Sequence, residues 1–361
     1  MIRVLIIHST TRGGGLTRIM YNICKELAVS EVEFHLLLLS PQLPTNTDGL
    51  FKEAGVNIIQ APNVGLLGSI KFIEDNIQKL SPQLIHTHGL RGNVFGSLCA
   101  GVLPHVSTLH GNMFYNYTTD FGLFKGIVSC LIHMVAFAGA SVQTVVSANL
   151  KSTSFISPKA IVIPNGIDTQ IFHSISSEHK AKMRKSLSIP LDAVVFIYAG
   201  RLSELKSVQT LLEAFKNIAP INNKAQLYIL GIGDSLPRLK SIAENHNQIF
   251  FKGQIAEVNH WYQAADVFIS PSLSEGMPNA PLEALGCGLE LLLSNIPPHR
   301  EVAALTGASI GFFEPKNVSQ LANLLINRMN FISTKPAVET ISIQQMSAKY
   351  LQVYKEVCNL T

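Results

Sequence analysis

Short apolar runs alternate with amphipathic stretches along most of the 361 residues. In residues 17–28, for example, Ile19, Met20, Ile23 and Leu27 recur at helical spacing on one face. The expected strands are Val4–Ile7, Phe34–Leu39, Val56–Ile59, Leu84–His88, Val106–His110, Gln143–Val146, Ile161–Ile163, Val194–Ala199, Gln226–Gly231, Gln248–Phe251, Val267–Ser270, Leu289–Ser294 and Ser309–Phe313. Nearly continuous apolar strands separated by helices are typical of a parallel sheet covered on both faces.

The alternation of strands and helices restarts after Pro190, which indicates two domains. A chain of 361 residues also exceeds the size at which a single core keeps growing. We therefore predict an α/β fold with two doubly wound, Rossmann-like domains, residues 1–172 and residues 173–344. Ligands of such sheets bind at the carboxyl ends of the strands, so the expected active site is the cleft between the domains.

The composition excludes several classes of protein. Hydrophobic residues make up 47% of the chain and charged residues 14%, and the net charge of +4 is too weak to indicate nucleic-acid binding. The five cysteines are scattered and form no C-x-x-C pair, which favours free thiols in a reducing compartment and no zinc site. The N-terminus leads directly into a strand and does not have the pattern of a signal peptide. We therefore expect a cytoplasmic protein.

Residues 126–146 contain no acidic or basic side chain apart from His133, and their number would suit a membrane span. However, the small residues Ala138–Ser141 interrupt the segment, and Gln143–Val146 has the pattern of a strand. We predict a buried helix followed by a strand. A helix that contacts a bilayer shallowly is the alternative, so peripheral membrane contact stays open.

Residues 267–294 have the pattern strand, loop, helix, strand, and they carry two carboxylates eight positions apart. Glu275 lies in the loop, and Glu283 is expected in the first turn of the helix, with Asn279 as its N-cap and its end at Gly286 or Gly288. The N–H groups of a helix N-terminus attract phosphate, whereas carboxylates repel phosphate and accept hydrogen bonds from hydroxyls. Phosphate with hydroxyls on both sides is the shape of a nucleotide sugar. On spacing alone, an ordinary loop and helix fit equally well.

Arg201 and Lys206 follow the first strand of the second domain. Arginine offers phosphate a planar fork of donors, and lysine offers a point charge. Two such cations stabilise a departing nucleoside diphosphate without a metal, and the chain has no Asp-x-Asp motif. A pair of surface cations is the alternative interpretation.

Further motifs follow strands of the first domain. The run Thr11–Gly15 either leaves backbone N–H groups for a ligand or only makes a tight turn, and it is not a dinucleotide-binding fingerprint. His86 and His88 alternate onto one face, where we favour packed or hydrogen-bonded histidines over metal ligands because no third ligand is evident. His110, followed by Gly111, lies where a strand opens toward the expected cleft.

The sequence SEGMPNAPLEALGCG, residues 274–288, resembles the E-x7-E signature of the retaining glycosyltransferases of family 4, which have the GT-B fold. GRLSELK at 200–206, PNGID at 164–168 and LGIGD at 230–234 resemble further motifs of this family. The resemblance covers nearly the whole chain and is strongest from 199 to 288. It also implies that a C-terminal helix, residues 345–361, crosses back to the first domain.

The resemblance implies a role for each candidate residue. Glu283 would hold the ribose hydroxyls, and Glu275 would hold the transferred sugar. Arg201 and Lys206 would clamp the diphosphate, and His110 would contact the donor sugar. The remaining nucleotide-sugar-binding positions would be Gly14, Gly15, Gly276, Met277, Pro278, Asn279 and Ala280.

The function implied by the resemblance is that of a metal-independent, retaining hexosyltransferase that needs no cofactor. It would move a hexose-type sugar from a nucleoside diphosphate sugar to a saccharide or a lipid-linked saccharide, in cell-surface polysaccharide synthesis. It would be cytoplasmic or would work at the cytoplasmic face of the membrane.

Two departures from the family pattern leave alternatives open. Glu290 stands where the family usually has proline, and Pro297-Pro298 replaces the commoner Gly-Gly. The alternative functions are a nucleotide-sugar epimerase and a non-catalytic nucleotide-sugar-binding protein, with a dehydrogenase as a third.

Overall fold

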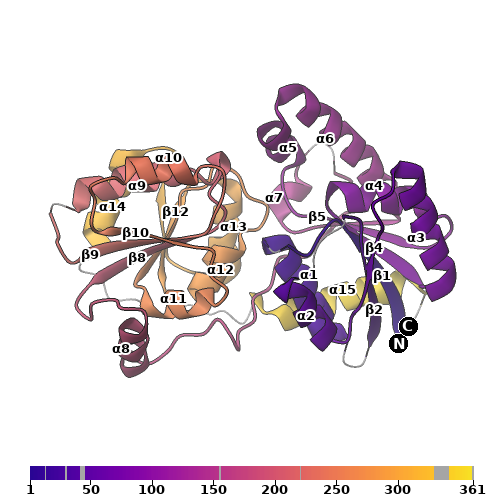
Figure 1. Ribbon diagram of the computed structural model, residues 1–361, viewed down its shortest axis with the longest axis horizontal. Helices are drawn as coiled ribbons and strands as arrows, with labels where there is room; N and C mark the ends of the chain where they lie inside the picture. Colours follow the sequence, from indigo (N-terminus) through magenta and orange to yellow (C-terminus); the bar gives the residue numbers. More distant parts are fainter. Residues whose placement is uncertain are drawn as a thin grey trace. The chain divides into compact units, whose positions relative to one another are not determined.

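The computed structural model describes residues 1–12, 14–28, 31–40, 45–153, 156–219, 221–328 and 341–359. The chain divides into two compact units: Met1–Gly166 with Ile343–Thr361, and Ile167–Ser342. Each unit is built around its own parallel sheet with helices on both faces (Figure 1). The predicted α/β fold with two Rossmann-like domains is therefore confirmed.

The described residues of the first unit form a seven-stranded parallel sheet. Its strands are β1 (Ile2–His8), β2 (Val32–Leu38), β3 (Asn57–Gln60), β4 (Leu84–His88), β5 (His105–Leu109), β6 (Val142–Val145) and β7 (Ile161–Val162). The strand order is β3-β2-β1-β4-β5-β6-β7, so the chain proceeds toward β3 on one side and toward β7 on the other. The order thus reverses between β1 and β4, and ligands of doubly wound sheets bind at such a reversal.

Two helical layers cover this sheet. Its helices are α1 (Gly15–Leu27), α2 (Asn46–Glu53), α3 (Leu66–Leu80), α4 (Gly89–Cys99), α5 (Met113–Phe121), α6 (Leu123–Ala138), α7 (Ala148–Lys151) and α15 (Ile343–Val357). Successive residues of a strand point to opposite faces, so Val4 and Ile6 join a core with α1 and α15. Leu5 and Ile7 join a second core with α3 and α4.

The last helix of the chain belongs to the first unit. Ile343, Met346, Tyr350 and Tyr354 of α15 are buried in the core formed by β1, β2 and α1, where Figure 1 shows the helix in yellow. The return of the C-terminal helix, which the family resemblance implied, is therefore observed.

The division between the units lies a few residues before the expected ones, at Gly166 instead of residue 172 and at Ser342 instead of residue 344. Ile167 forms a parallel bridge with Ser342, and Phe172 packs against Tyr262 with 6.3 Å between the ring centroids. These contacts attach residues 167–172 to the second unit.

The described residues of the second unit form a six-stranded parallel sheet of order β10-β9-β8-β11-β12-β13. Its strands are β8 (Val194–Ala199), β9 (Ala225–Leu230), β10 (Ile249–Gly253), β11 (Val267–Ser270), β12 (Glu290–Ser294) and β13 (Ile310–Phe313). Its helices are α8 (Ser177–Ser186), η1 (Glu204–Lys206), α9 (Val208–Ile218), α10 (Leu236–Ile242), α11 (Val258–Ala264), α12 (Asn279–Gly286), α13 (Pro297–Thr306) and α14 (Val318–Arg328). The strand order reverses between β8 and β11, so the segments that leave these two strands are brought together at one edge.

The charge-poor segment 126–146 forms a helix and then a strand, as predicted. The prediction that this helix is buried is wrong for one of its faces. Phe124 and Val135 of α6 are 81% and 75% exposed, because α4 and α5 cover the opposite side of the helix. Among the described residues, no helix combines the length and the apolar character that crossing a membrane requires.

Candidate functional site

The segments that leave β8 and β11 meet through one half-buried ion pair. Lys206 is the last residue of η1, and Glu275 lies in the loop after β11. The Lys206 Nζ is 2.5 Å from the Glu275 Oε1, and the two side chains are only 27% and 11% exposed. The Leu273 N–H also donates to the Leu205 carbonyl at 2.8 Å. The two loops are therefore fixed to each other by a backbone and a side-chain bond.

The ion pair sets the protonation of its carboxylate. Burial is the largest single influence and raises the pKa of Glu275, but the charge and hydrogen bond of Lys206, together with His299 and a hydrogen bond from Ser272, lower this pKa below its ordinary value. His299 lies nearby, and burial lowers its pKa to about 4. At neutral pH, Glu275 is thus an ionised carboxylate and His299 is a neutral imidazole.

His299 also fixes the strand ends beneath this pair. Its Nδ1 lies 2.8 Å from the Ser294 carbonyl at the end of β12, and its Nε2 lies 3.4 Å from the Ser270 Oγ at the end of β11. Sequence reasoning missed this residue. Its position directly after Pro297-Pro298, at the start of the helix that follows β12, was the available signal.

Arg201 follows β8 as expected, but it lies in a different ion pair. Its guanidinium Nη2 is 3.6 Å from the Asp234 Oδ2, and its side chain is 58% exposed. Its carbonyl accepts a hydrogen bond from the Tyr198 hydroxyl at 3.0 Å. Both predicted cations therefore emerge at the carboxyl end of β8, with Lys206 more enclosed than Arg201.

The neighbouring strand end depends on glycine. Gly231 follows β9 with φ of +134°, and a Cβ there would collide with the Gly200 carbonyl. The Gly200 N–H donates to the Leu230 carbonyl at 3.0 Å, and the Gly231 N–H donates to the Gly253 carbonyl at 2.7 Å. The ends of β8, β9 and β10 are thereby drawn together at the edge that carries Arg201 and Lys206.

The helix after Glu275 starts differently from the prediction. Pro278, with extended backbone (φ −77°, ψ 118°), is the N-cap of α12, and Asn279 is its first residue. Glu283 is therefore the fifth helical residue, in the second turn, and the predicted first-turn position is wrong. Proline has no side-chain acceptor, so the side chain of Pro278 does not cap the first N–H groups of α12. The predicted helix end at Gly286 is confirmed.

The predicted loop residues surround this helix start. Gly276, Met277 and Pro278 are buried, and Asn279 and Ala280 are half-buried, as is Glu283. The positions named from the sequence therefore form one continuous turn that leads from the ion pair into α12.

The two departures from the family pattern both fit regular structure. Glu290 is the half-buried first residue of β12, where its N–H donates to the Asp266 carbonyl at 3.2 Å. Pro297 and Pro298 are the first two residues of α13, which Ile296 caps in an extended conformation. Proline is favoured at the first position of a helix, because its missing N–H would have no partner there.

In the first unit, Gly14 and Gly15 lie where β1 passes into α1. Gly14 is the N-cap of α1 with φ of +103°, a conformation that favours glycine, and Gly15 is the first helical residue. Gly13, in the same run, lies outside the described residues.

Three histidines of this unit form a buried chain along β4 and β5. The His86 ring lies 2.7 Å from both the Tyr354 hydroxyl and the Thr108 hydroxyl, so it is the hydrogen-bonded residue that we favoured. The His88 Nδ1 lies 2.8 Å from the His110 Nε2. Burial lowers the pKa of His86 and of His110 to about 3, and it lowers the pKa of His88 as well, so all three rings are neutral at pH 7. Among the described residues, no group of three or more His, Cys, Asp or Glu side chains is arranged to hold a metal ion.

A small cavity lies beside His110. It has a volume of about 160 Å³ and is lined in part by Asn116 and Tyr117 of α5 and by His133 of α6. The His133 Nδ1 lies 2.6 Å from the Tyr117 hydroxyl, and its Nε2 lies 2.6 Å from the Asn93 amide. The rest of its lining includes Gly89 and residues 108–111, so the cavity is built from separate segments of the chain, and His110 is the one lining residue that was a candidate from the sequence.

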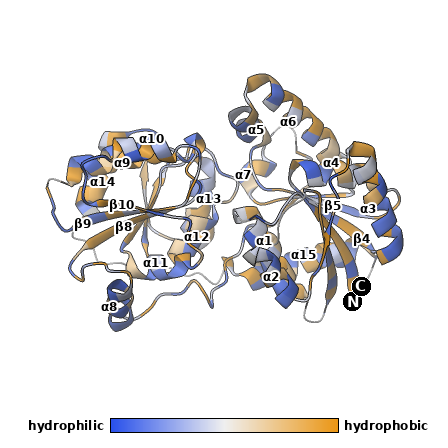
Figure 2. Ribbon diagram, in the orientation of Figure 1, coloured by the Kyte–Doolittle hydropathy of each residue, from blue (hydrophilic) through white to orange (hydrophobic). Residues whose placement is uncertain are grey.

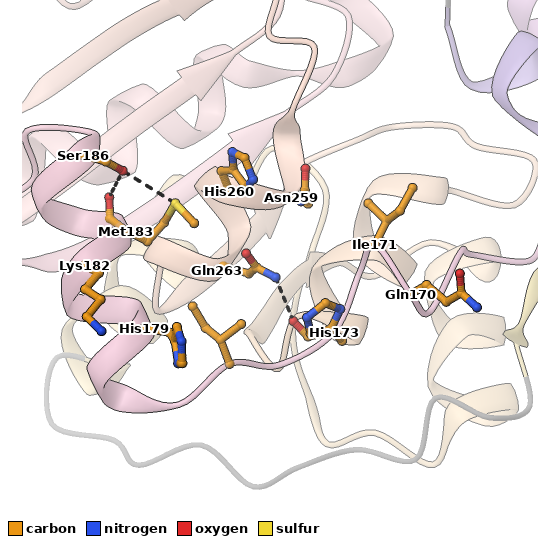
Figure 3. A pocket seen from close by; sticks show the side chains of 11 residues that line it. Gln170, Ile171, His173, His179, Lys182, Met183, Ser186, Asn259, His260 and Gln263 are labelled. Atoms are coloured by element: carbon orange, nitrogen blue, oxygen red, sulfur yellow. Dashed lines mark hydrogen bonds between the residues drawn. The ribbon is translucent and has the colours of Figure 1, made fainter. Parts of the chain in front are cut away.

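A larger pocket of about 600 Å³ lies between α8, α11 and residues 170–175 (Figure 3). Gln263 of α11 donates to the His173 carbonyl at 3.2 Å at its base, and the ring of His179 faces the same opening. The lining includes none of the residues that the sequence singled out as candidates.

Comparison with known proteins accounts for both units. The family model described as Glycosyltransferase Family 4 matches residues 13–171, and the model described as Glycosyl transferases group 1 matches residues 179–330. The chain belongs to these glycosyltransferases. Together the two matches cover most of the sequence.

Individual relatives match this glycosyltransferase along its length. The Escherichia coli O-antigen biosynthesis glycosyltransferase WclY is 22% identical over 99% of both chains. The Escherichia coli UDP-Gal:alpha-D-GlcNAc-diphosphoundecaprenol alpha-1,3-galactosyltransferase is 27% identical over 65% of this chain and 64% of its own. Anabaena HepE, solved in complex with UDP and glucose, has the same fold, with a TM-score of 0.76, 17% identity and coverage of 99% and 95% of the two chains.

Proposed function

We propose that this glycosyltransferase moves a hexose-type sugar from a nucleoside diphosphate sugar to a saccharide or lipid-linked saccharide, in cell-surface polysaccharide synthesis. The half-buried Lys206–Glu275 pair carries the proposal, because it combines a cation for phosphate with an acceptor for sugar hydroxyls at a strand-order reversal. The names of WclY and of the galactosyltransferase support the class of product. The HepE complexes with UDP and with UDP-glucose support the class of donor.

The proposed chemistry retains the configuration at the anomeric carbon. The bond from C1 to the diphosphate oxygen breaks, and the acceptor hydroxyl forms its bond to C1 on the same face. The acceptor's proton moves to the departing phosphate. Lys206 and Arg201 stabilise the negative charge of the nucleoside diphosphate, and Lys206 has donors left for phosphate because its ammonium carries three N–H groups.

The remaining predicted residues complete the donor site in this proposal. Glu275 accepts a hydrogen bond from a sugar hydroxyl, and Glu283 accepts hydrogen bonds from the ribose. His110, neutral at pH 7, offers the sugar a hydrogen bond without a competing charge. The partial positive charge at the N-terminus of α12 attracts phosphate. A lipid-linked acceptor would bring the enzyme to the cytoplasmic face of a membrane.

The test is incubation with a panel of UDP- and GDP-sugars, first without and then with saccharide acceptors. We expect binding of one donor class by calorimetry, and a product whose anomeric configuration, read by NMR, equals that of the donor. Isomerised donor in the absence of acceptor would instead indicate an epimerase. Binding without turnover across the acceptors would indicate a non-catalytic protein, and an inverted product would contradict the mechanism.

We also propose that the two cations replace a metal. Addition of EDTA should leave the transfer rate unchanged, and addition of Mg²⁺ should not increase it. A strict requirement for a divalent cation in this assay would contradict the proposed roles of Arg201 and Lys206.

A further inference from the structure

Helix α6 and the end of α5 present a continuous apolar surface. We call it the outer face and define it by six exposed side chains: Phe121, Leu123, Phe124, Val128, Leu131 and Val135. Phe124, Val135 and Leu123 are the most exposed, at 81%, 75% and 67%. Figure 2 shows α6 as hydrophobic over most of its length. Large contiguous apolar patches are uncommon on soluble monomers and mark interaction sites.

The outer face is not the side by which α6 packs in its unit. Gly126, Cys130, His133 and Phe137 are buried, at the helical spacing of four, three and four residues. The outer-face residues 124, 128, 131 and 135 repeat this spacing two positions earlier, which places them on the opposite side of the helix. A helix that is apolar on both sides is typical of a helix covered on both sides. Here α4 and α5 cover only one side.

The packed side makes a firm support. A Cβ at Gly126 of α6 would collide with the backbone at Thr118 of α5, so the two helices approach each other as closely as backbones do. The His133 ring bonds to Tyr117 of α5 and to Asn93 of α4. The outer face is therefore held in place by the same contacts that line the cavity beside His110.

The charge of this region favours a lipid surface over an acidic or basic protein partner. Lys125, exposed beside Phe124, is the one acidic or basic side chain of α6 other than the buried, neutral His133. Anionic lipid head groups attract such a lysine, and the nearest carboxylate in the sequence is Asp120, which is exposed at the end of α5 beside Phe121. With one exposed cation and one exposed anion, the region has no charge pattern to match a strongly acidic or basic protein. With 16 residues, about 24 Å long, α6 is too short to cross a hydrocarbon core of about 30 Å and suits an interfacial position.

We propose that the outer face docks on a lipid bilayer, with α6 lying in the plane of the interface. The cavity beside His110, on the inner side of the same two helices, then takes the polar head of an acceptor whose tail stays in the bilayer, with the hydrogen-bonding groups of His110, Asn116 and Tyr117 in its lining. The second statement rests on the proposed function, whereas the docking itself depends only on the outer face.

The docking is tested by sedimentation with vesicles of phosphatidylcholine alone and of phosphatidylcholine mixed with phosphatidylglycerol. The test variant carries Phe124→Gln, Leu131→Gln and Val135→Gln. The matched control carries Leu67→Gln, Leu191→Gln and Ile221→Gln, three equally large and exposed apolar positions outside α5 and α6. Circular dichroism and thermal unfolding verify that both variants fold.

We expect the wild type and the control to bind the mixed vesicles more tightly than phosphatidylcholine alone. The partition coefficient of the test variant onto the mixed vesicles should be about 100-fold lower than that of the wild type. This corresponds to a factor of about five for each of the three partly inserted side chains. Equal binding by the test variant and the control, or no binding by the wild type, would overturn the proposal. Wild-type dimers that the test variant abolishes, seen by light scattering without vesicle binding, would assign the outer face to a second copy and overturn it too.

A second measurement separates docking from the proposed function. Donor binding by UDP and GDP, measured by calorimetry without vesicles, should be the same in the wild type and in both variants. Vesicle binding without any binding of either nucleotide would retain the docking and contradict the donor proposal. Nucleotide binding without vesicle binding would retain the donor proposal and contradict the docking.

Discussion

Lys206 and Glu275 depend on each other because both are enclosed. Removing one partner of an enclosed ion pair leaves the other as an uncompensated charge. We predict that Lys206→Ala lowers kcat/KM for transfer by about 10³-fold, since it removes a fixed cation at a departing diphosphate. The comparison variant is Lys240→Ala, an exposed lysine of α10 in the same unit, and it should remain within about twofold of the wild type. Equal activities of the two variants would contradict the role of Lys206.

The same pair predicts a pH dependence of stability. In the wild type, the pKa of Glu275 lies below its ordinary 4.5, so its contribution is present above that value and is lost as the pH falls through the lowered pKa. Without Lys206, burial is the largest remaining influence and raises this pKa, so the variant is penalised most at neutral pH. The difference in Tm between the wild type and Lys206→Ala should therefore shrink from pH 7 to pH 4.5.

A double variant verifies the assignment of this pH effect. Adding Glu275→Gln to Lys206→Ala removes the titrating group while keeping its shape. In the single variant, the loss of Tm relative to the wild type grows from pH 4.5 to pH 7 because Glu275 ionises without its partner. The double variant has no carboxylate at this position, so its loss of Tm should not show that growth. A pH profile unchanged by Glu275→Gln would show that another group titrates.

At the scale of elements, the carboxyl ends of β8, β9 and β10 meet through glycines. A Cβ at Gly231 would collide with the Gly200 carbonyl, and φ of +134° strains any other residue. We predict that Gly231→Ala destabilises the protein by about 3 kcal/mol or more. Gly49→Ala in α2, where a Cβ meets nothing within 4 Å, should be neutral or stabilising by up to about 1 kcal/mol. Urea unfolding of the two variants provides the comparison.

The elements themselves were largely predictable, because buried parallel strands are short apolar runs and helices have their own period. The residue at which a helix starts, and which of its faces is exposed, were harder to predict. Asn279 is a better N-cap by propensity, but the buried turn through Gly276 and Pro278 starts α12 one residue earlier. The exposed face of α6 was missed because an apolar helix is expected to be covered, and the sequence does not indicate whether another part of the chain or an external partner covers it.

The site residues divide in the same way. The motifs at the strand ends indicated Lys206 and Glu275 separately. Their ion pair forms because β8 lies beside β11 in the sheet, and the order of the strands in the sequence does not predict that these two are neighbours. His88 beside His110 likewise depends on the register that pairs His88 with Thr108 across β4 and β5. A local sequence pattern carries an element's chemistry, whereas contacts between elements require the topology.

At the scale of the whole molecule, the chain closes the first unit with its last helix. Tyr354 of α15 is fully buried in that core, and its hydroxyl bonds to the His86 Nδ1 at 2.7 Å. We predict that Tyr354→Phe destabilises the first unit by about 1–3 kcal/mol, because it leaves a buried imidazole nitrogen without its partner. Tyr228→Phe, which removes a half-enclosed hydroxyl bond to Gln226 in the second unit, should cost less than about 1 kcal/mol.

Calorimetry of the intact chain distinguishes where each substitution acts. Each unit has its own core, so we expect two unfolding transitions that respond separately. Most of the proposed nucleotide contacts lie in the second unit, so UDP or GDP should raise its transition the most, whereas Tyr354→Phe should lower the other transition. If Tyr354→Phe shifted the nucleotide-sensitive transition instead, the last helix would stabilise the donor-binding unit. The assignment of α15 to the core of the first unit would then not describe the molecule in solution.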